Sequence, residues 1–190
     1  MRILAVLTLL FLEVSAVYAF QVKMPPRTYF NGEWEVVTKS LRRDGTYDIG
    51  RARVSNYLVE NGNFTVSEFR QLALHDSVIY SGISLETFDP ASGTSYISWM
   101  VNGSPHQTWI VQNADGTASG KGIDGIGEFL ERSHFLEIKP DWYSWQMDRS
   151  YDDGKTWIPG FALLEFRRIK ENETTRIHVG TGNSKQEGQE

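Results

Sequence analysis

Short segments in which apolar and polar residues alternate fill most of this chain, and turn-forming residues separate them. Alternation with a period of two is typical of strands with one buried face, because successive side chains of a strand point to opposite faces. No helical run competes with this pattern. We expect strands at 33–40, 47–59, 64–74, 78–88, 94–102, 107–112, 117–122, 127–139, 142–151 and 160–169. Ten strands is the upper count that the pattern predicts.

The connections between these segments carry Gly, Asn and Asp, which accept a positive φ. They lie at 43–45, 60–62, 89–93, 114–116 and 152–154. Strands joined by tight turns form an antiparallel meander, and a long meander hides its edges most simply by closing on itself. The sequence therefore predicts an all-β fold, a single antiparallel up-and-down β-barrel of eight to ten strands, which can hold a small ligand or fill its own centre.

The composition fits one globular domain. A chain of 190 residues that is 40% apolar can build one core. Its net charge is -5 and its basic residues are scattered, so we expect no nucleic-acid surface. The absence of cysteine excludes disulfides and zinc sites of the Cys type.

Residues 1–19 have the features of a signal peptide: a basic start at Arg2, an apolar run, and the small-residue pattern that ends at Ala19. Glu13 interrupts the apolar run and argues against a membrane-spanning helix. We expect cleavage after Ala19 and an exported protein, periplasmic or extracellular, without stable membrane insertion. The expected organisation is a signal peptide at 1–19, a lead at 20–29, the barrel at 30–169 and a disordered tail at 170–190.

The stretch S-Y-D-D-G-K-T-W from Ser150 to Trp157 resembles the Asp-box hairpins of sialidases. The resemblance implies that Asp152 accepts hydrogen bonds within a hairpin, that Gly154 takes a conformation closed to other residues, and that Trp157 packs on the barrel. Sialidases carry several such boxes, away from the catalytic pocket, and one occurs here. We therefore expect a structural hairpin at this position.

Gly32-Glu33-Trp34 begins the first expected strand, and Arg167-Arg168 ends the last. This resembles the lipocalin and calycin arrangement, in which a G-x-W tryptophan packs beneath an arginine of the final strand and seals one end of the barrel. The resemblance implies a cation–π contact worth about 0.5–2 kcal/mol. The alternation of the last strand favours Arg168 as the partner. In the alternative interpretation, Trp34 is ordinary core and Arg168 a solvated strand end.

Two longer segments, 88–99 and 142–157, resemble a bacterial family of small calycin-like barrels known only as a domain of unknown function. The first holds the turn F-D-P-A-S-G, and the second holds Trp145, Gln146 and Ser150 ahead of the D-x-G-x-T-W hairpin. The resemblance covers about 30–169, although only five glycines between 116 and 127 represent the family's Gly-rich middle. It implies no catalytic residues.

One face of the segment 142–151 is largely aromatic. It carries Tyr143, Trp145, Met147, Arg149 and Tyr151, whereas the other face is polar. We expect the aromatic face to line the lumen. An inward arginine then needs a carboxylate, a ligand anion or solvent at a barrel mouth.

The expected lumen is aromatic with a few polar groups, which suits a small apolar or aromatic molecule. The candidate ligand-binding residues are Tyr80, Trp99, Trp109, Tyr143, Trp145 and Arg149. In the alternative interpretation, these aromatic residues only fill the core.

The chain lacks a G-x-S-x-G motif, and its four histidines show no metal-ligand spacing. The sequence therefore assigns no catalytic residue, no cofactor and no metal site. Two alternatives to ligand binding stay open. One is an enzyme for a small lipophilic substrate with Asp148, Glu128 or His134 as general base, and the other is an envelope or interaction module without a small ligand.

Overall fold

The computed structural model describes residues 22–59, 62–103 and 106–170. Within these ranges nearly all regular structure is strand, with two short 3-10 helices. The elements are η1 (Arg27–Phe30), β1 (Gly32–Leu41), β2 (Tyr47–Val59), β3 (Phe64–Leu72), η3 (Leu74–Asp76), β4 (Val78–Asp89), β5 (Thr94–Val101), β6 (Gln107–Gln112), β7 (Ala118–Ile123), β8 (Glu128–Lys139), β9 (Trp142–Ser150) and β10 (Ile158–Arg168). Each expected strand is present, and its ends agree with the expected ones to within two residues. The expected leader at 1–19 and the tail beyond residue 170 lie outside the described residues.

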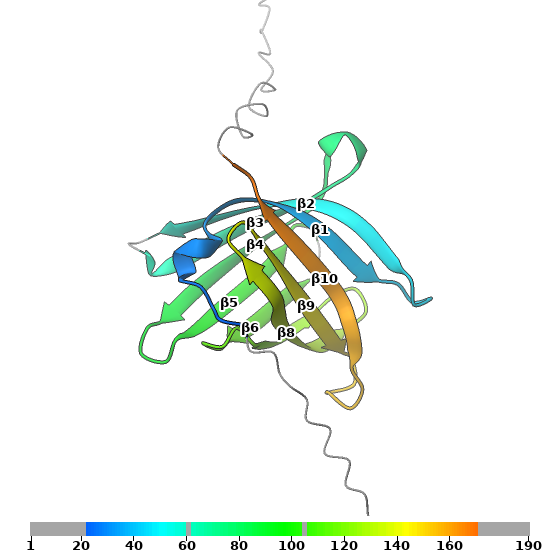
Figure 1. Cartoon of the computed structure of the whole chain (residues 1–190). Coiled ribbons are helices and arrows are strands. Elements are labelled where there is room, and N and C mark those ends of the chain that lie inside the picture. The colour runs from blue at the N-terminus through cyan, green and yellow to red at the C-terminus, as the bar shows by residue number, and fades with distance from the viewer. Residues whose placement is uncertain (1–21, 60–61, 104–105, 171–190) are drawn as a thin grey trace, which may run out of the picture.

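The ten strands form one closed antiparallel barrel in which each strand pairs with its neighbours in the chain (Figure 1). β1 pairs with β10 and closes the cylinder, with Trp34 opposite Arg168. The predicted all-β up-and-down barrel is confirmed, and its architecture fits a calycin-like fold.

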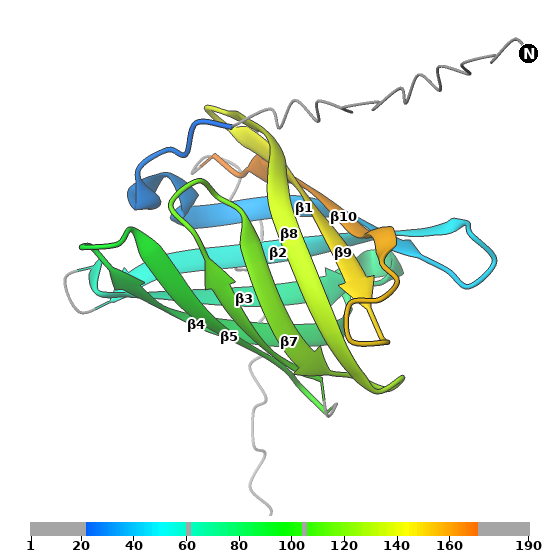
Figure 2. The ribbon, with the colours of Figure 1, turned by 90° about the horizontal axis from the view of Figure 1, so that it is seen from below.

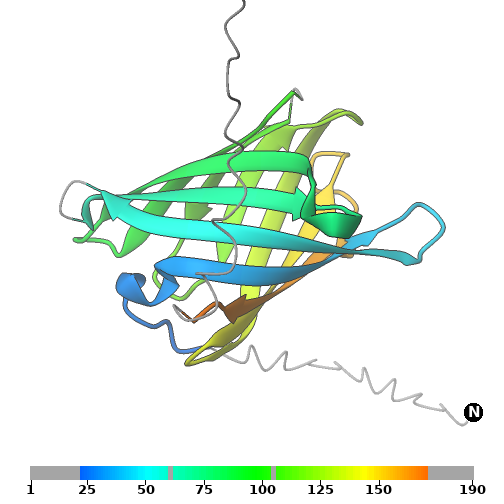
Figure 3. The same cartoon turned by 90° about the horizontal axis from the view of Figure 1, so that it is seen from above.

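The two ends of the barrel differ. At the end where β1 begins, which we name the closed end, η1 lies beside the barrel. The β1–β2 hairpin projects from the opposite end, which we name the mouth (Figures 2 and 3). The connections after β1, β3, β5, β7 and β9 all belong to the mouth.

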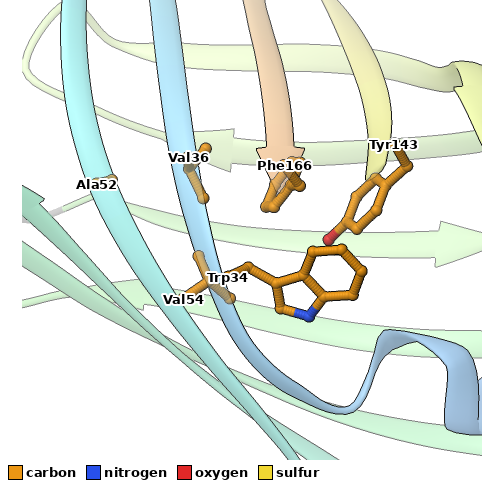
Figure 4. Packing of buried hydrophobic residues seen from close by; sticks show 6 residues of the cluster. All are labelled: Trp34, Val36, Ala52, Val54, Tyr143 and Phe166. Atoms are coloured by element: carbon orange, nitrogen blue, oxygen red, sulfur yellow. The ribbon is translucent and has the colours of Figure 1, made fainter. Parts of the chain in front are cut away.

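A compact core fills the closed end (Figure 4). Trp34 is 0% exposed, and the Tyr143 ring lies edge-on to it at 4.9 Å and stacks on Phe166 at 4.2 Å. Val36, Ala52 and Val54 complete the cluster. Close packing of this kind costs little polar desolvation, because the Trp34 indole N–H donates to the Phe30 carbonyl at 2.9 Å.

The lead before β1 covers the closed end. Arg27 donates to the Gly62 carbonyl at 3.1 Å and to the Thr65 hydroxyl at 2.9 Å, which ties η1 to β3. The Tyr29 hydroxyl contacts the carbonyls of Lys139 and Trp142 on the other side of the barrel. The sequence assigned no structural role to this lead, and the structure shows it as a lid over one end.

No helix in the described ranges is long and apolar enough to cross a bilayer.

Candidate ligand-binding lumen

Inward-facing side chains in the middle of the barrel are only partly buried. The strand register places them on the same face as Trp34. They are Phe69, Ile97, Trp99, Ile110, Phe135, Trp145, Met147 and Leu164. Since the barrel is closed, the surface that they retain faces the lumen. The described side chains therefore leave apolar and aromatic surface accessible inside the barrel.

Trp145 points into this lumen. It pairs with Leu164 on one side and with Phe135 on the other, and both belong to the inward row. The polar residues next to Trp145, Ser144 and Gln146, take the outer face, as the alternation of the sequence predicts.

Trp99 and Tyr80 lie together toward the mouth. Gly82 makes room for Trp99, because a Cβ at Gly82 would stand 2.4 Å from the indole ring. The Trp99 indole N–H donates to the Tyr80 hydroxyl, and Phe69 contacts both rings edge-on at 5.9 and 6.0 Å. Burial raises the pKa of Tyr80, although the residue is 36% exposed at the rim. These three rings form an aromatic wall between the mouth and the lumen.

Arg149 is buried in the opposite wall. Its Nη1 donates to Asp124 Oδ2 at 2.8 Å, and its Nη2 lies 3.5 Å from Glu131 Oε2. The guanidinium sits between two rings, with its Cζ 3.8 Å from the centroid of Phe129 and 4.3 Å from that of Phe161. The sequence required a partner for this arginine, and the structure supplies two carboxylates.

The two carboxylates of this cluster have pKa values shifted in opposite directions. Burial raises the pKa of Glu131, and the nearby Arg149 charge only partly opposes the shift. Burial also acts to raise the pKa of Asp124, but hydrogen bonds from the Tyr151 hydroxyl and from two backbone N–H groups, together with the Arg149 charge, lower it overall. Arg149 and ionised Asp124 therefore form a neutral pair, and Glu131 is the group whose charge is disfavoured.

His106 borders the same cluster. Its ring lies edge-on to Phe129 at 5.8 Å, and its Nε2 is 3.4 Å from the Thr108 hydroxyl. Burial lowers the pKa of His106, and the Arg149 charge lowers it further. The imidazole is therefore held toward its neutral form, which suits an apolar surrounding.

Two of the candidate ligand-binding residues lie elsewhere. Trp109 is on the outer wall and 47% exposed, opposite Ser98 and Lys121. The prediction that it lines the lumen is wrong, because the segment 107–112 has apolar residues in both phases and only the register with β5 and β7 decides which faces inward. Tyr143 does face inward, but it is 5% exposed in the closed-end core, where Trp34 and Phe166 cover it.

Arg168 stands over Trp34, with its Cζ 4.1 Å from the ring centroid. Its Nη1 donates to the Asn31 carbonyl at 2.6 Å, and its Nη2 donates to the Tyr29 carbonyl. Arg168 thus holds the segment before β1 against the barrel.

The β9–β10 connection has the geometry of a braced hairpin. Asp152 accepts bonds from the Thr156 N–H at 2.8 Å, the Thr156 hydroxyl at 2.6 Å and the Ser150 hydroxyl at 2.8 Å. The bonds from Thr156, followed by the one from Ser150, lower the pKa of Asp152 to about 2. Gly154 has φ +81°, and the Trp157 ring lies 4.4 Å beneath Arg132 on the outer wall.

The three residues considered as general bases do not line the lumen. Asp148 is on the outer face, where it accepts bonds from Arg132, Gln146 and the Gly160 N–H. Glu128 is exposed, and His134 pairs with Gln146 on the outer face. Among the described residues no cluster of three or more His, Asp or Glu side chains is placed to hold a metal ion.

Sequence reasoning missed several residues of the Arg149 cluster. Glu131 could have been found, because Phe129, Glu131 and Ser133 alternate in one phase of β8 and one phase must face inward. Asp124 lies in the β7–β8 connection, and no local pattern links it to Arg149.

No family model matches this chain, and no curated protein matches it. Solved structures similar to it include the S-type phycobiliprotein lyase CpeS of Guillardia theta, at 13% identity and a TM-score of 0.48, with 75% of this chain and 89% of that chain covered. Another is a protein of unknown function of the DUF3598 family from Nostoc punctiforme, at 17% identity and a TM-score of 0.43. The match covers 75% of this chain and 48% of that one, so this chain spans about half of that protein. Membership of a particular family stays a prediction.

Proposed function

We propose that this protein is an exported β-barrel that binds a small apolar or aromatic molecule in its lumen. The observation that supports this most directly is the set of inward aromatic and aliphatic side chains that keep accessible surface within a closed barrel. A barrel that served only as a scaffold would gain stability by filling this space.

The lumen favours a neutral ligand with a flat part. Trp99 and Trp145 offer aromatic surface; Trp145 lies between the apolar Leu164 and Phe135, whereas the cross-strand neighbours of Trp99 are Ser84 and Thr108, whose hydroxyls are small and neutral. Arg149 is held by Asp124 and Glu131, so its charge is already compensated. An anionic ligand would have to compete with these carboxylates, whereas a neutral one would not.

The ligand would enter through the mouth. The lead and η1 cover the closed end, and Arg168 and Tyr29 fasten them there. At the mouth, Tyr80 is partly exposed, and its ring lies next to Trp99 and Phe69. Aromatic side chains along this path suit the passage of an apolar molecule.

Binding can be tested with the neutral fluorescent probe N-phenyl-1-naphthylamine. We expect saturable binding of one probe per chain, and binding of at least one member of a lipid, haem and isoprenoid panel in competition with it. Ile97→Trp adds bulk inside the lumen and should weaken probe binding by about tenfold or more. Val37→Trp, on the outer wall of β1, is the matched control and should leave binding unchanged.

Two results would contradict the proposal. One is the absence of saturable probe binding together with no response to the panel. The other is an equal effect of Ile97→Trp and Val37→Trp when circular dichroism shows both variants folded.

Export rests on the pattern of residues 1–19 and is part of the same proposal. Expression with its own leader in a bacterial host should give a periplasmic or secreted protein whose intact mass corresponds to a chain starting at Phe20. Recovery of the uncleaved chain in the cytosol would count against export. It would not bear on ligand binding, which the probe titration tests separately.

The other two functions have less support. The candidate general bases Asp148, Glu128 and His134 are outside the lumen, so they cannot act on a substrate bound there. The exposed residues of the outer wall are also compatible with an interaction module. In that case the lumen of the barrel would have no part in the function.

A further inference from the structure

The outer wall of β4, β5 and β6 carries a continuous group of exposed apolar side chains, which we name the outer patch. The register makes them neighbours: Ile83 is opposite Met100, Leu85 and Trp109 flank Ser98, and Tyr96 is opposite Val111. Their exposed fractions are Ile83 42%, Leu85 45%, Tyr96 53%, Met100 43%, Trp109 47% and Val111 40%.

Elsewhere the outer wall is built differently. On β1 and β10 it carries ion pairs, with Lys39 Nζ 2.6 Å from Glu165 and Arg167 Nη2 2.7 Å from Glu35. Alternating charge of this kind keeps an exposed sheet face soluble. Exposed apolar side chains elsewhere, such as Val37 on β1 and Leu136 on β8, are separate, whereas the six members of the outer patch are neighbours on three adjacent strands.

The outer patch is large enough to matter for association. Six side chains of this size, each about half exposed, present on the order of 500 Å² of apolar surface, at the upper end of what a soluble monomer shows. Tyr57 on β2 and Ile123 on β7 lie beyond it, across Val66 of β3 and Gln107 of β6, and are 42% and 40% exposed. With these residues the surface approaches the roughly 800 Å² per partner of a standard specific interface.

The positions of Leu85 and Trp109, on either side of Ser98, suit the pairing of this wall with a second copy of itself. A hollow of about 390 Å³ lies beside the patch on the β3–β5 side, and Ile83 and Met100 line it together with the charged Glu68 and Arg70. Trp109 stands on the β6 side. A twofold axis along β5 brings Trp109 onto Leu85 of a second copy, because both lie at the level of Ser98.

We propose that a second copy of this chain covers the outer patch in a twofold-symmetric dimer, with the axis running along β5. Such an axis places β4 of one copy over β6 of the other, so Trp109 packs on Leu85 of the second copy and the reverse contact follows by symmetry. Residues of β5 near the axis face their own counterparts. The segment 171–190 is too polar in sequence to be the occupant.

The chain is expressed with its own leader, and its intact mass identifies the N terminus. Sedimentation equilibrium then measures the dissociation constant of the dimer. Trp109→Arg should raise the dimer dissociation constant about thirtyfold or more, since a buried central tryptophan is a typical hot spot. Val37→Arg, on the outer wall of β1, should leave it unchanged. Both variants should still bind the lumen probe, so a failure of this proposal is separable from a failure of ligand binding.

A cross-linking experiment tests the position of the axis. The chain has no cysteine, so Ser98→Cys introduces one thiol at the centre of the outer patch. Facing sheets lie about 10 Å apart, so a short bis-maleimide suits this distance. Ser98→Cys should form covalent dimer at least about tenfold faster than Val37→Cys, because two thiols held close together at the interface react at a higher effective concentration.

Three outcomes would overturn the proposal. The first is a monomer at about 100 μM, a concentration at which even a weak specific dimer would be populated. A monomer that binds phosphatidylcholine vesicles in a flotation assay counts as the same outcome. The second is a dimer that Trp109→Arg does not weaken, and the third is equal cross-linking of Ser98→Cys and Val37→Cys.

Discussion

Arg149 is the one inward-facing charged residue of β9, and its partners determine whether the lumen carries an uncompensated charge. A buried guanidinium is costly unless it is paired and hydrogen-bonded. Here Asp124 supplies the opposite charge, Glu131 offers a second carboxyl group, and the rings of Phe129 and Phe161 pack against the guanidinium. The inward face of β9 thus carries a cation whose charge is compensated by its neighbours. The lumen therefore suits neutral ligands.

Replacing Arg149 should be strongly destabilising. Arg149→Met leaves two carboxylates buried without their cation, so we expect the free energy of unfolding to fall by about 3–5 kcal/mol. Adding Asp124→Asn and Glu131→Gln should recover much of the loss. Arg167→Met breaks the exposed pair with Glu35 and should cost about 1 kcal/mol or less. Urea unfolding compares the variants, and similar losses for Arg149→Met and Arg167→Met would contradict the buried-cluster interpretation.

Asp152 makes the low-pH behaviour of the hairpin predictable. Its pKa is about 2 in the folded chain, below the ordinary value of 3.8, so the folded state binds fewer protons than the unfolded state between these values. Its contribution to stability is present above about pH 4 and is lost as the pH falls through about 2. Thr156→Val removes the hydroxyl that donates at 2.6 Å and should raise the pKa of Asp152. Carboxyl NMR titration measures this, and an unchanged pKa would show that the Thr156 hydroxyl is not the main cause.

At the scale of elements, β7 illustrates close packing between a strand and the side chains above it. Gly120 and Gly122 both face the lumen, where a Cβ at Gly122 would stand 2.6 Å from the Phe129 ring. The absence of a Cβ at Gly122 leaves room for the Phe129 ring, which packs against Arg149. The glycines that seemed only part of a Gly-rich middle therefore serve the Arg149 cluster.

Substitutions in β7 should distinguish these positions. Gly122→Ala forces Phe129 and the Gln107 carbonyl to shift, so we expect a loss of about 1–3 kcal/mol in the free energy of unfolding. Gly125→Ala, in the adjacent connection, meets no atom within 4 Å and should change stability by less than about 0.5 kcal/mol. Thermal or urea unfolding gives both values. A neutral Gly122→Ala would mean that this wall is free to rearrange.

On the scale of the whole molecule, the barrel divides into a packed end and an accessible middle. The closed end carries the fully buried cluster of Trp34, Tyr143 and Phe166, and the lead covers it from outside. In the middle of the barrel, inward side chains such as Trp145 and Met147 remain partly exposed, whereas the Arg149 cluster nearer the mouth is buried again. The accessible inward surface thus begins where Trp145 and Leu164 leave the closed-end core, against which they still pack.

This division predicts different costs for two neighbouring aromatic residues of β9. Tyr143→Ala opens a cavity in the closed-end core and should lower the free energy of unfolding by about 3–5 kcal/mol. Trp145→Ala removes a half-buried ring beside the lumen and should cost less, about 1–2 kcal/mol, while weakening probe binding. Urea unfolding and the probe titration measure the two effects. Equal destabilisation by both substitutions would indicate a lumen packed as tightly as the closed end.

Much of this organisation could be predicted from residues close together in the chain. The period of two and the turn residues placed all ten strands, because both are local properties of the backbone. The same alternation put Trp145 and Arg149 in one phase of β9, with Ser144 and Gln146 in the other. The Asp152 hairpin was also predictable, since its donors lie within four residues.

Long-range contacts decided what local patterns could not. Trp109 lies outside because β5 and β7 set the phase of a six-residue strand that is apolar in both phases. Asp124 reaches Arg149 across 25 residues, and the lead covers the closed end through contacts with β3 and the β8–β9 connection. The sequence by itself determined where strands and turns form, because local sterics and period govern them. Only the closed barrel decided which face is the lumen and which charges meet there, because those depend on neighbours brought together by closure.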